Sequence, residues 1–141
     1  MTQDNFVIKV ARRDVAAARG RGDRLGEAQA LSELAAVLTG PNRSSEARLV
    51  LSQLKSIGEE LIGPAEQAVA DARHQGDLRA EVYALAKLSK VLRYAGRYGQ
   101  AERVLAQFSQ RNHEQFVLDN RKDAERARET NGLALSDHPG F

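Results

Sequence analysis

The chain has 141 residues and a formal net charge of +2, with 42% hydrophobic, 28% charged and only 5% aromatic residues. This composition predicts one globular domain and excludes a disordered or histone-like chain. The absence of Cys excludes disulfides, thiol catalysis and zinc–thiolate sites. No segment has the length and apolarity of a signal peptide or a membrane span, so we expect a cytoplasmic protein without membrane contact.

A first helix is predicted over about residues 6–19, where aliphatic side chains recur at helical spacing. Gly22 and Asp23 are expected to end this helix and to start the next one. Glycine readily takes the left-handed backbone conformation that closes a helix, and aspartate caps the helix that follows.

The first predicted helical hairpin spans about residues 24–62, with its turn at Gly40-Pro41-Asn42. Gly63 and Pro64 are then expected to stop the second helix of this hairpin. Because proline is tolerated in the first turn of a helix, a short separate helix is predicted from Pro64 to His74.

Residues 69–105 repeat residues 15–51 at a fixed offset of 54, with 16 identities in 37 positions. A self-match of this length indicates a repeat protein. The shared positions of the first helix lie mainly on one apolar face, and they are Glu27, Ala30, Leu31, Leu34, Val37 and Leu38, matched by Glu81, Ala84, Leu85, Leu88, Val91 and Leu92. The repeat therefore predicts a second hairpin over about residues 78–111.

The repeated unit also has a characteristic order of leucines and small residues. The second copy carries Leu85, Leu88, Leu92, Gly96, Tyr98, Ala101 and Leu105, and the first carries Leu31, Leu34, Leu38, Asn42, Ser44, Ala47 and Leu51. This order resembles the tetratricopeptide repeat (TPR). The resemblance implies an all-α fold of antiparallel hairpins stacked as a short right-handed solenoid, for which we expect six to seven helices. The offset of 54 exceeds the roughly 34 residues of that family, so the stack is either irregular or closed into a bundle.

A terminal helix is predicted over about residues 113–130, and its end resembles the start of another unit. The matching segments are Ala127-Arg128 ahead of Asn131 and Ala72-Arg73 ahead of Gly76. This helix suits a degenerate third copy that caps the stack. The single domain is then expected to cover residues 1–132, with residues 133–141 as a flexible tail.

The strongest functional signal is a helix face that the two copies do not share. It carries Tyr83, Lys87, Lys90 and Tyr94, with Arg97 nearby, where the first copy has Gln29, Glu33, Ala36 and Gly40. Packing requirements are common to both copies, so a face that differs is expected to be free of them. In the TPR family this helix lines the groove that holds peptides. The resemblance therefore implies that these five residues bind a peptide or partner protein, and the basic groups suit an acidic one. The alternative is a solvated helix face.

Other chemistry has weaker support. A second basic cluster, made of Arg12, Arg13, Arg19, Arg21 and Arg24, leaves a nucleic-acid-associated regulator as an alternative to a solvated surface. No histidine has a second ligand at metal spacing, and no catalytic set is evident. We therefore expect a non-enzymatic adaptor, scaffold or regulatory subunit without cofactor or metal. Phe108 and Phe116 either pack beneath the last helix or form an apolar edge for a homodimer.

Overall fold

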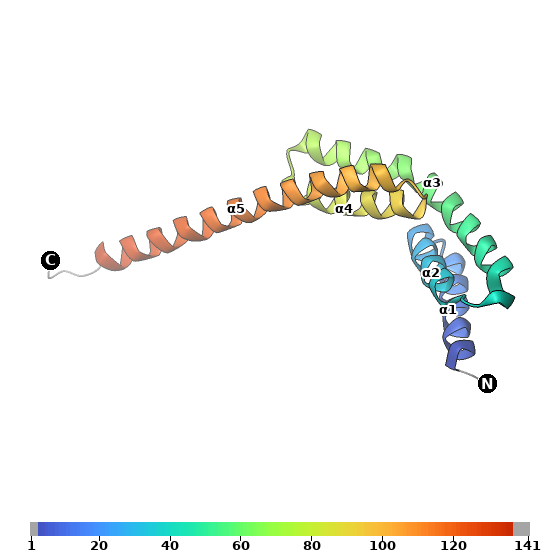
Figure 1. Cartoon of the computed structure of the whole chain (residues 1–141). Helices are drawn as coiled ribbons and strands as arrows, with labels where there is room; N and C mark the ends of the chain where they lie inside the picture. The colour runs from blue at the N-terminus through green and yellow to red at the C-terminus, as the bar shows by residue number, and fades with distance from the viewer. Residues whose placement is uncertain (1–2, 137–141) are drawn as a thin grey trace.

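In a computed structural model of the chain, residues 3–136 and the side chains of residues 6–132 are described, and every long element is an α-helix. The elements are α1 (Gln3–Gly20), α2 (Arg24–Val37), the 3₁₀ helix η1 (Pro41–Arg43), α3 (Ser44–Gln75), α4 (Leu78–Tyr94) and α5 (Tyr98–Ser136). Each α-helix packs against the next one in the chain, and α2 also contacts α4. The all-α prediction is confirmed (Figure 1).

The turns that precede α2 and α4 have the same construction. Gly22 and Gly76 have φ of 69° and 67°, in the left-handed region that favours glycine. Asp23 then accepts a hydrogen bond from the backbone N of Gly26 at 2.9 Å, and Asp77 accepts one from the backbone N of Ala80 at 3.1 Å. The helix end and cap predicted at Gly22-Asp23 are therefore confirmed, and the second copy repeats them at Gly76-Asp77.

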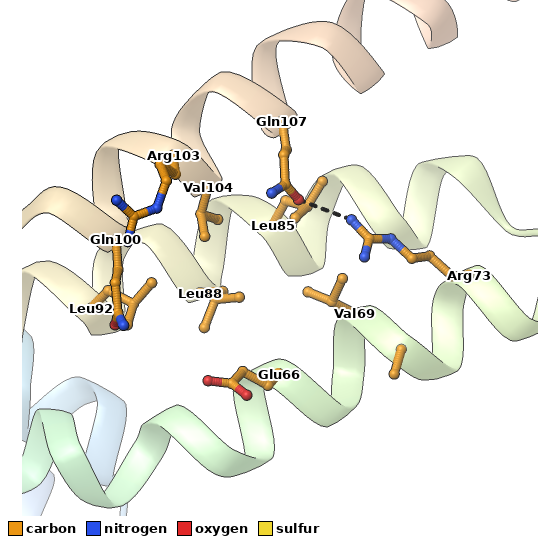
Figure 2. Close-up of a pocket in the computed structure, with 11 residues that line it drawn as sticks. Glu66, Val69, Arg73, Leu85, Leu88, Leu92, Gln100, Arg103, Val104 and Gln107 are labelled. Carbon is orange, nitrogen blue, oxygen red and sulfur yellow. Dashed lines mark hydrogen bonds between the residues drawn. The ribbon is translucent and has the colours of Figure 1, made fainter. Parts of the chain in front are cut away.

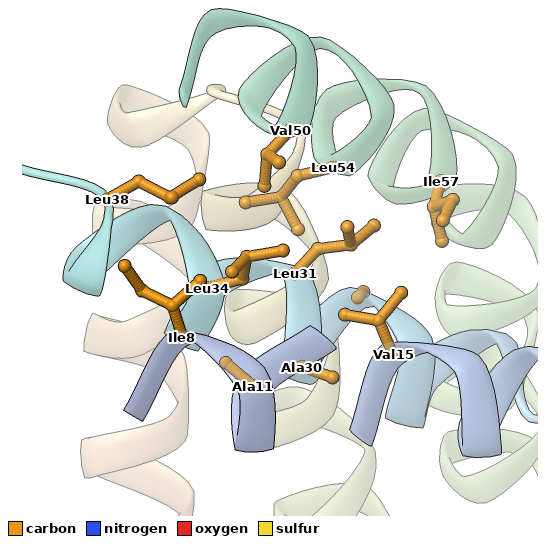
Figure 3. Packing of buried hydrophobic residues seen from close by; sticks show 11 residues of the cluster. Ile8, Ala11, Val15, Ala30, Leu31, Leu34, Leu38, Val50, Leu54 and Ile57 are labelled. Atoms are coloured by element: carbon orange, nitrogen blue, oxygen red, sulfur yellow. The ribbon is translucent and has the colours of Figure 1, made fainter. Parts of the chain in front are cut away.

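Two clusters of buried aliphatic side chains hold the helices together. The first cluster joins α1, α2 and the first half of α3, through Ile8, Ala11, Val15, Ala30, Leu31, Leu34, Leu38, Val50, Leu54 and Ile57 (Figure 3). The second joins the rest of α3 to α4 and the start of α5, through Ile62, Ala65, Val69, Ala84, Leu85, Leu88, Val91, Leu92, Ala95 and Ala101. Leu61 packs against both clusters.

The predicted break at Gly63-Pro64 is wrong, because α3 continues through both residues to Gln75. Ile62 and Ala65, on either side of the break, are both buried in the second cluster, and this packing favours a continuous helix. Pro64 lies on the exposed side, where water can reach the backbone carbonyl that lacks the proline's amide donor. Figure 1 shows α3 changing direction between its two halves, as proline commonly causes.

The predicted break near Asn112 is also wrong, since α5 runs without interruption to Ser136. Asn112 is only a moderately poor helix former, and no proline or strained glycine accompanies it. Residues 133–136 are helical rather than a tail, and residues 137–141 lie outside the described residues. With both breaks absent, the described chain forms five α-helices instead of six to seven.

The two hairpins meet where the end of α4 crosses α3 at Gly58. A Cβ atom on Gly58 would lie 2.5 Å from the backbone N of Ala95, so only glycine permits this approach. Next to it, Arg97 pairs with Glu59, with Nη2 2.7 Å from Oε2, and Arg24 pairs with Glu60, with Nε 2.8 Å from Oε2. We call this region the junction.

The second half of α5 extends away from the other helices (Figure 1). Near the middle of α5, Asp119 still bonds to α4, accepting a hydrogen bond from Nη2 of Arg79 at 3.1 Å. Residues 120–132 are all exposed. We call residues 120–136 the α5 overhang.

Candidate functional site: the outer face of α4

Three of the five predicted binding residues form an exposed row along α4. Tyr83 is 72% exposed, and Lys87 and Lys90 are also exposed. Neither lysine makes an ion pair with a side chain that the structure describes. Their spacing of four and three residues keeps the three side chains on one side of the helix. We call Tyr83, Lys87 and Lys90 the Tyr–Lys row.

Tyr94 has the same spacing but a different environment. Its ring is half-buried and packs against the first core cluster. Burial raises the pKa of the Tyr94 hydroxyl, and the negative charge of Glu33 on α2 raises it further. The equivalent residue of the first copy is Gly40, so this difference between the copies serves packing at the junction.

Arg97 is likewise engaged within the molecule. Its Nε and Nη2 donate hydrogen bonds to Oε1 and Oε2 of Glu59 at 3.0 and 2.7 Å. This two-pronged pair holds the start of α5 against α3 and lowers the pKa of Glu59. The structure thus brings the Tyr–Lys row together and places Tyr94 and Arg97 in the junction.

An apolar pocket of about 150 Å³ adjoins Lys87. Its walls come from three helices and consist of Leu25, Leu61, Pro64, Ala65, Ala68, Lys87 and Val91. The pocket can take a small apolar side chain while the lysine ammonium remains at its edge. Charge and an apolar recess therefore occur side by side on this surface.

A larger groove of about 460 Å³ lies between α3 and α5, and side chains of α4 also line it (Figure 2). Its apolar side chains are Val69, Ala70, Leu85, Leu88, Leu92 and Val104, and its polar ones are Glu66, Arg73, Gln100, Arg103 and Gln107. Nη2 of Arg73 donates a hydrogen bond to Oε1 of Gln107 at 3.0 Å, which bridges the groove between α3 and α5. Sequence reasoning missed this groove.

A signal for the groove was present in the internal repeat. In the first copy, Arg12 on α1 donates two hydrogen bonds to Glu46 on α3, which links the helices on both sides of α2. At the offset of 54, these positions become Glu66 and Gln100, for which no such bond is found in the described structure. The second copy therefore lacks the ion pair that the first copy has, and the groove lies at this position.

Two buried glutamates occupy equivalent positions in the repeat. Glu27 and Glu81 are only 2% and 3% exposed. Glu27 pairs with Arg19 and Arg24, and Glu81 pairs with Arg73 and Arg111. Burial opposes ionisation of Glu81, but the hydrogen bonds from Arg111 and Arg73 outweigh it and lower the pKa of this carboxyl. A carboxylate held ionised in this way stabilises the fold and is poorly suited to donate a proton.

The predicted basic cluster near the N-terminus is largely neutralised. Its ion pairs are Arg12 with Glu46, Arg19 with Glu27, Arg21 with Asp23, and Arg24 with both Glu27 and Glu60. These arginines therefore have carboxylate partners that a phosphate would have to displace. Within residues 6–132, no group of three His, Asp or Glu side chains is placed to hold a metal ion.

Comparisons of the chain with protein-family models, with curated proteins and with solved structures gave no match. Among the described helices, none combines the length and the apolar character that crossing a membrane requires.

Proposed function

We propose that this chain is a non-enzymatic protein–protein interaction module, built as a short TPR-like right-handed solenoid. It binds a carboxylate-bearing peptide or partner protein along the outer face of α4. The observation that carries the proposal is the Tyr–Lys row itself: an exposed tyrosine and two ammonium groups without an ion pair among the described residues, on one helix side next to an apolar pocket.

Each part of this surface has a distinct physical role. The tyrosine offers a large rigid area that loses little conformational entropy on binding. The ammonium groups of Lys87 and Lys90 attract carboxylates and orient the partner, and the pocket beside Lys87 accepts an apolar side chain. Tyr94 and Arg97 act indirectly, because they fix the end of α4 at the junction.

The test uses charge reversal on the row. The immobilised chain captures partners from an extract of its native cells, and the captured protein is purified and titrated by calorimetry. Replacing both Lys87 and Lys90 by Glu is expected to weaken binding at least about tenfold, since two attractions become repulsions. The melting temperature should stay nearly unchanged because both side chains are exposed.

The matched control is the double replacement of Lys9 and Lys55 by Glu, which changes the net charge equally at exposed sites on α1 and α3. It should leave the affinity within about twofold of the original. Equal weakening by both double variants, or no weakening by the first, would refute the proposed site.

The alternative of a nucleic-acid-associated regulator has less support, because the N-terminal arginines are ion-paired within the molecule. It is tested with labelled duplex and single-stranded probes at low salt. A mobility shift whose affinity falls steeply with added salt would favour this alternative over the proposal.

A further inference from the structure

Helices α1 and α3 present the same buried face to the helix that follows each of them. On α1 the face consists of Ile8, Ala11, Val15 and Ala18, and on α3 it consists of Ile62, Ala65, Val69 and Ala72. The following helices, α2 and α4, pack on these two faces. The steps of three, four and three residues are identical, so one docking design is used twice.

Each of these faces ends in an arginine that meets a buried glutamate of the docked helix. Nε of Arg19 lies 3.1 Å from Oε2 of Glu27, and Nε of Arg73 lies 3.2 Å from Oε2 of Glu81. The glutamate stands four residues after the capping aspartate in both helices. The ion pair therefore sets the register in which the second helix packs on the first.

A partial third version of this face occurs on α5, and there it is uncovered: Ala127 and Arg128 match Ala72 and Arg73, whereas Asn120 replaces Ala65. With one extra residue in the offset, the corresponding residues are Val117, Asn120, Ala124, Ala127 and Arg128. All five are exposed, and Val117 is 41% exposed. Arg128 makes no ion pair with any residue that the structure describes.

The segment that follows this face differs from the first two copies. Where the first copies have Gly22-Asp23 and Gly76-Asp77, α5 has Asn131-Gly132 and remains helical through Ser136. The chain therefore makes no turn there, and within the described residues no following helix packs on the face. The extra residue rotates this face by about 100° around the axis of α5, compared with where an offset of 54 would place it. A helix docked on the face would therefore not continue the line of α2 and α4.

We propose that the Val117–Arg128 face docks an amphipathic helix of a partner protein, antiparallel to α5, with a glutamate near its N-terminus that pairs with Arg128. The small side chain of Ala127 allows close approach, as Ala18 does on α1, and Ala124 is smaller than Val15 at the corresponding position. This surface lies on a different helix from the Tyr–Lys row, and the inference does not depend on the function proposed for that row.

The probe is a fluorescein-labelled synthetic peptide with the sequence of residues 77–95, since α4 is a helix known to fit such a face. Binding to the full chain is followed by fluorescence anisotropy. We expect saturable binding that the substitution Arg128→Glu weakens at least about tenfold. The control substitution Arg126→Glu changes the charge equally on another side of α5 and should leave the affinity within about twofold.

A charge exchange separates this pairing from non-specific attraction. A peptide carrying Glu81→Arg should bind the original chain weakly and regain at least about half of the lost affinity toward the Arg128→Glu chain. No binding at about 1 mM protein, equal weakening by both arginine substitutions, or no recovery in the exchanged pair would overturn the proposal.

Occupation of the face by a second copy is a distinct outcome. Sedimentation equilibrium of the original chain should show a monomer in the concentration range of the peptide titration. A dimer that Ala124→Glu dissociates would place another copy of α5 on this face and overturn the proposal of a partner helix.

Discussion

At the residue scale, the buried glutamates show how charge is accommodated inside this small core. Glu81 accepts hydrogen bonds from Nε of Arg73 at 3.2 Å and from Nε of Arg111 at 2.8 Å, so three helices share one carboxylate. Each arginine keeps part of its side chain in water, which limits the desolvation cost to the glutamate. The ion pairs thus fix the relative positions of α3, α4 and α5.

We predict that Glu81→Gln lowers the free energy of unfolding by about 2 kcal/mol, because it leaves two arginines without their buried carboxylate. Urea unfolding followed by circular dichroism measures the change. Glu114→Gln is the control, since Glu114 pairs with the same Arg111 but its side chain is 40% exposed, and it should have a much smaller effect. Equal effects of the two substitutions would contradict this role for Glu81.

The sequence could predict some of these residue roles and not others. The helix caps at Asp23 and Asp77 depend on neighbours three residues away, and the pattern identifies them. Arg97 meets Glu59 across 38 residues of chain, and no local pattern reports such a contact. The assignment of Arg97 to the binding surface rested on its nearness in sequence to the lysines alone.

At the element scale, helix continuity is decided by packing more than by local signals. Gly63-Pro64 has the composition of a break, yet α3 continues because its buried side fits the second cluster on both sides of the proline. The faces of α2 and α4 were predictable from apolar spacing, because that spacing reports burial directly. The lengths of α3 and α5 were not predictable in this way. Helix α3 continues through Gly63-Pro64 because of contacts formed only in the folded chain, and α5 continues through Asn112 because no proline accompanies this moderately poor helix former.

We predict that Gly58→Ala destabilises the fold by about 2 kcal/mol, because its Cβ would overlap the backbone where α4 ends against α3. Gly99→Ala is the matched control, since Gly99 lies in the first turn of α5 with open space around its Cα. The control should leave stability unchanged or slightly raised. Thermal unfolding compares the two, and a stable Gly58→Ala chain would disprove the tight crossing.

At the scale of the whole molecule, ion pairs between helices make stability depend on pH. The pKa values of Glu59, Glu60 and Asp119 are lowered by hydrogen bonds from Arg97, Arg24 and Arg79, respectively. When the pH falls, the unfolded chain therefore binds protons before the folded chain does. This contribution to stability is complete above the ordinary glutamate pKa of 4.5 and is lost as the pH falls through the lowered values.

We predict a melting temperature that changes little between pH 7 and pH 5 and then falls steadily toward pH 3. Circular dichroism at 222 nm across this series measures it. Added salt should reduce the size of the fall, because these pairs are partly exposed and salt screens them. A melting temperature that is constant down to pH 3 would show that the interhelical pairs contribute nothing.

The internal repeat was the most informative feature of the sequence for the whole molecule, and its differences proved as useful as its identities. Comparing the copies position by position identifies the open groove through Glu66 and Gln100 and the uncovered face of α5 through Val117 and Arg128. The one-residue change of offset in α5 conceals the third copy from a search at a fixed period.

The uninterrupted α3 has a consequence for how the molecule comes apart. Its first half belongs to one core cluster and its second half to the other, and Leu61 belongs to both. Neither hairpin can unfold without exposing apolar surface of α3, a helix that the other hairpin also packs against. Differential scanning calorimetry should therefore show one unfolding peak, with equal van't Hoff and calorimetric enthalpies. Two independently folding hairpins would give two peaks.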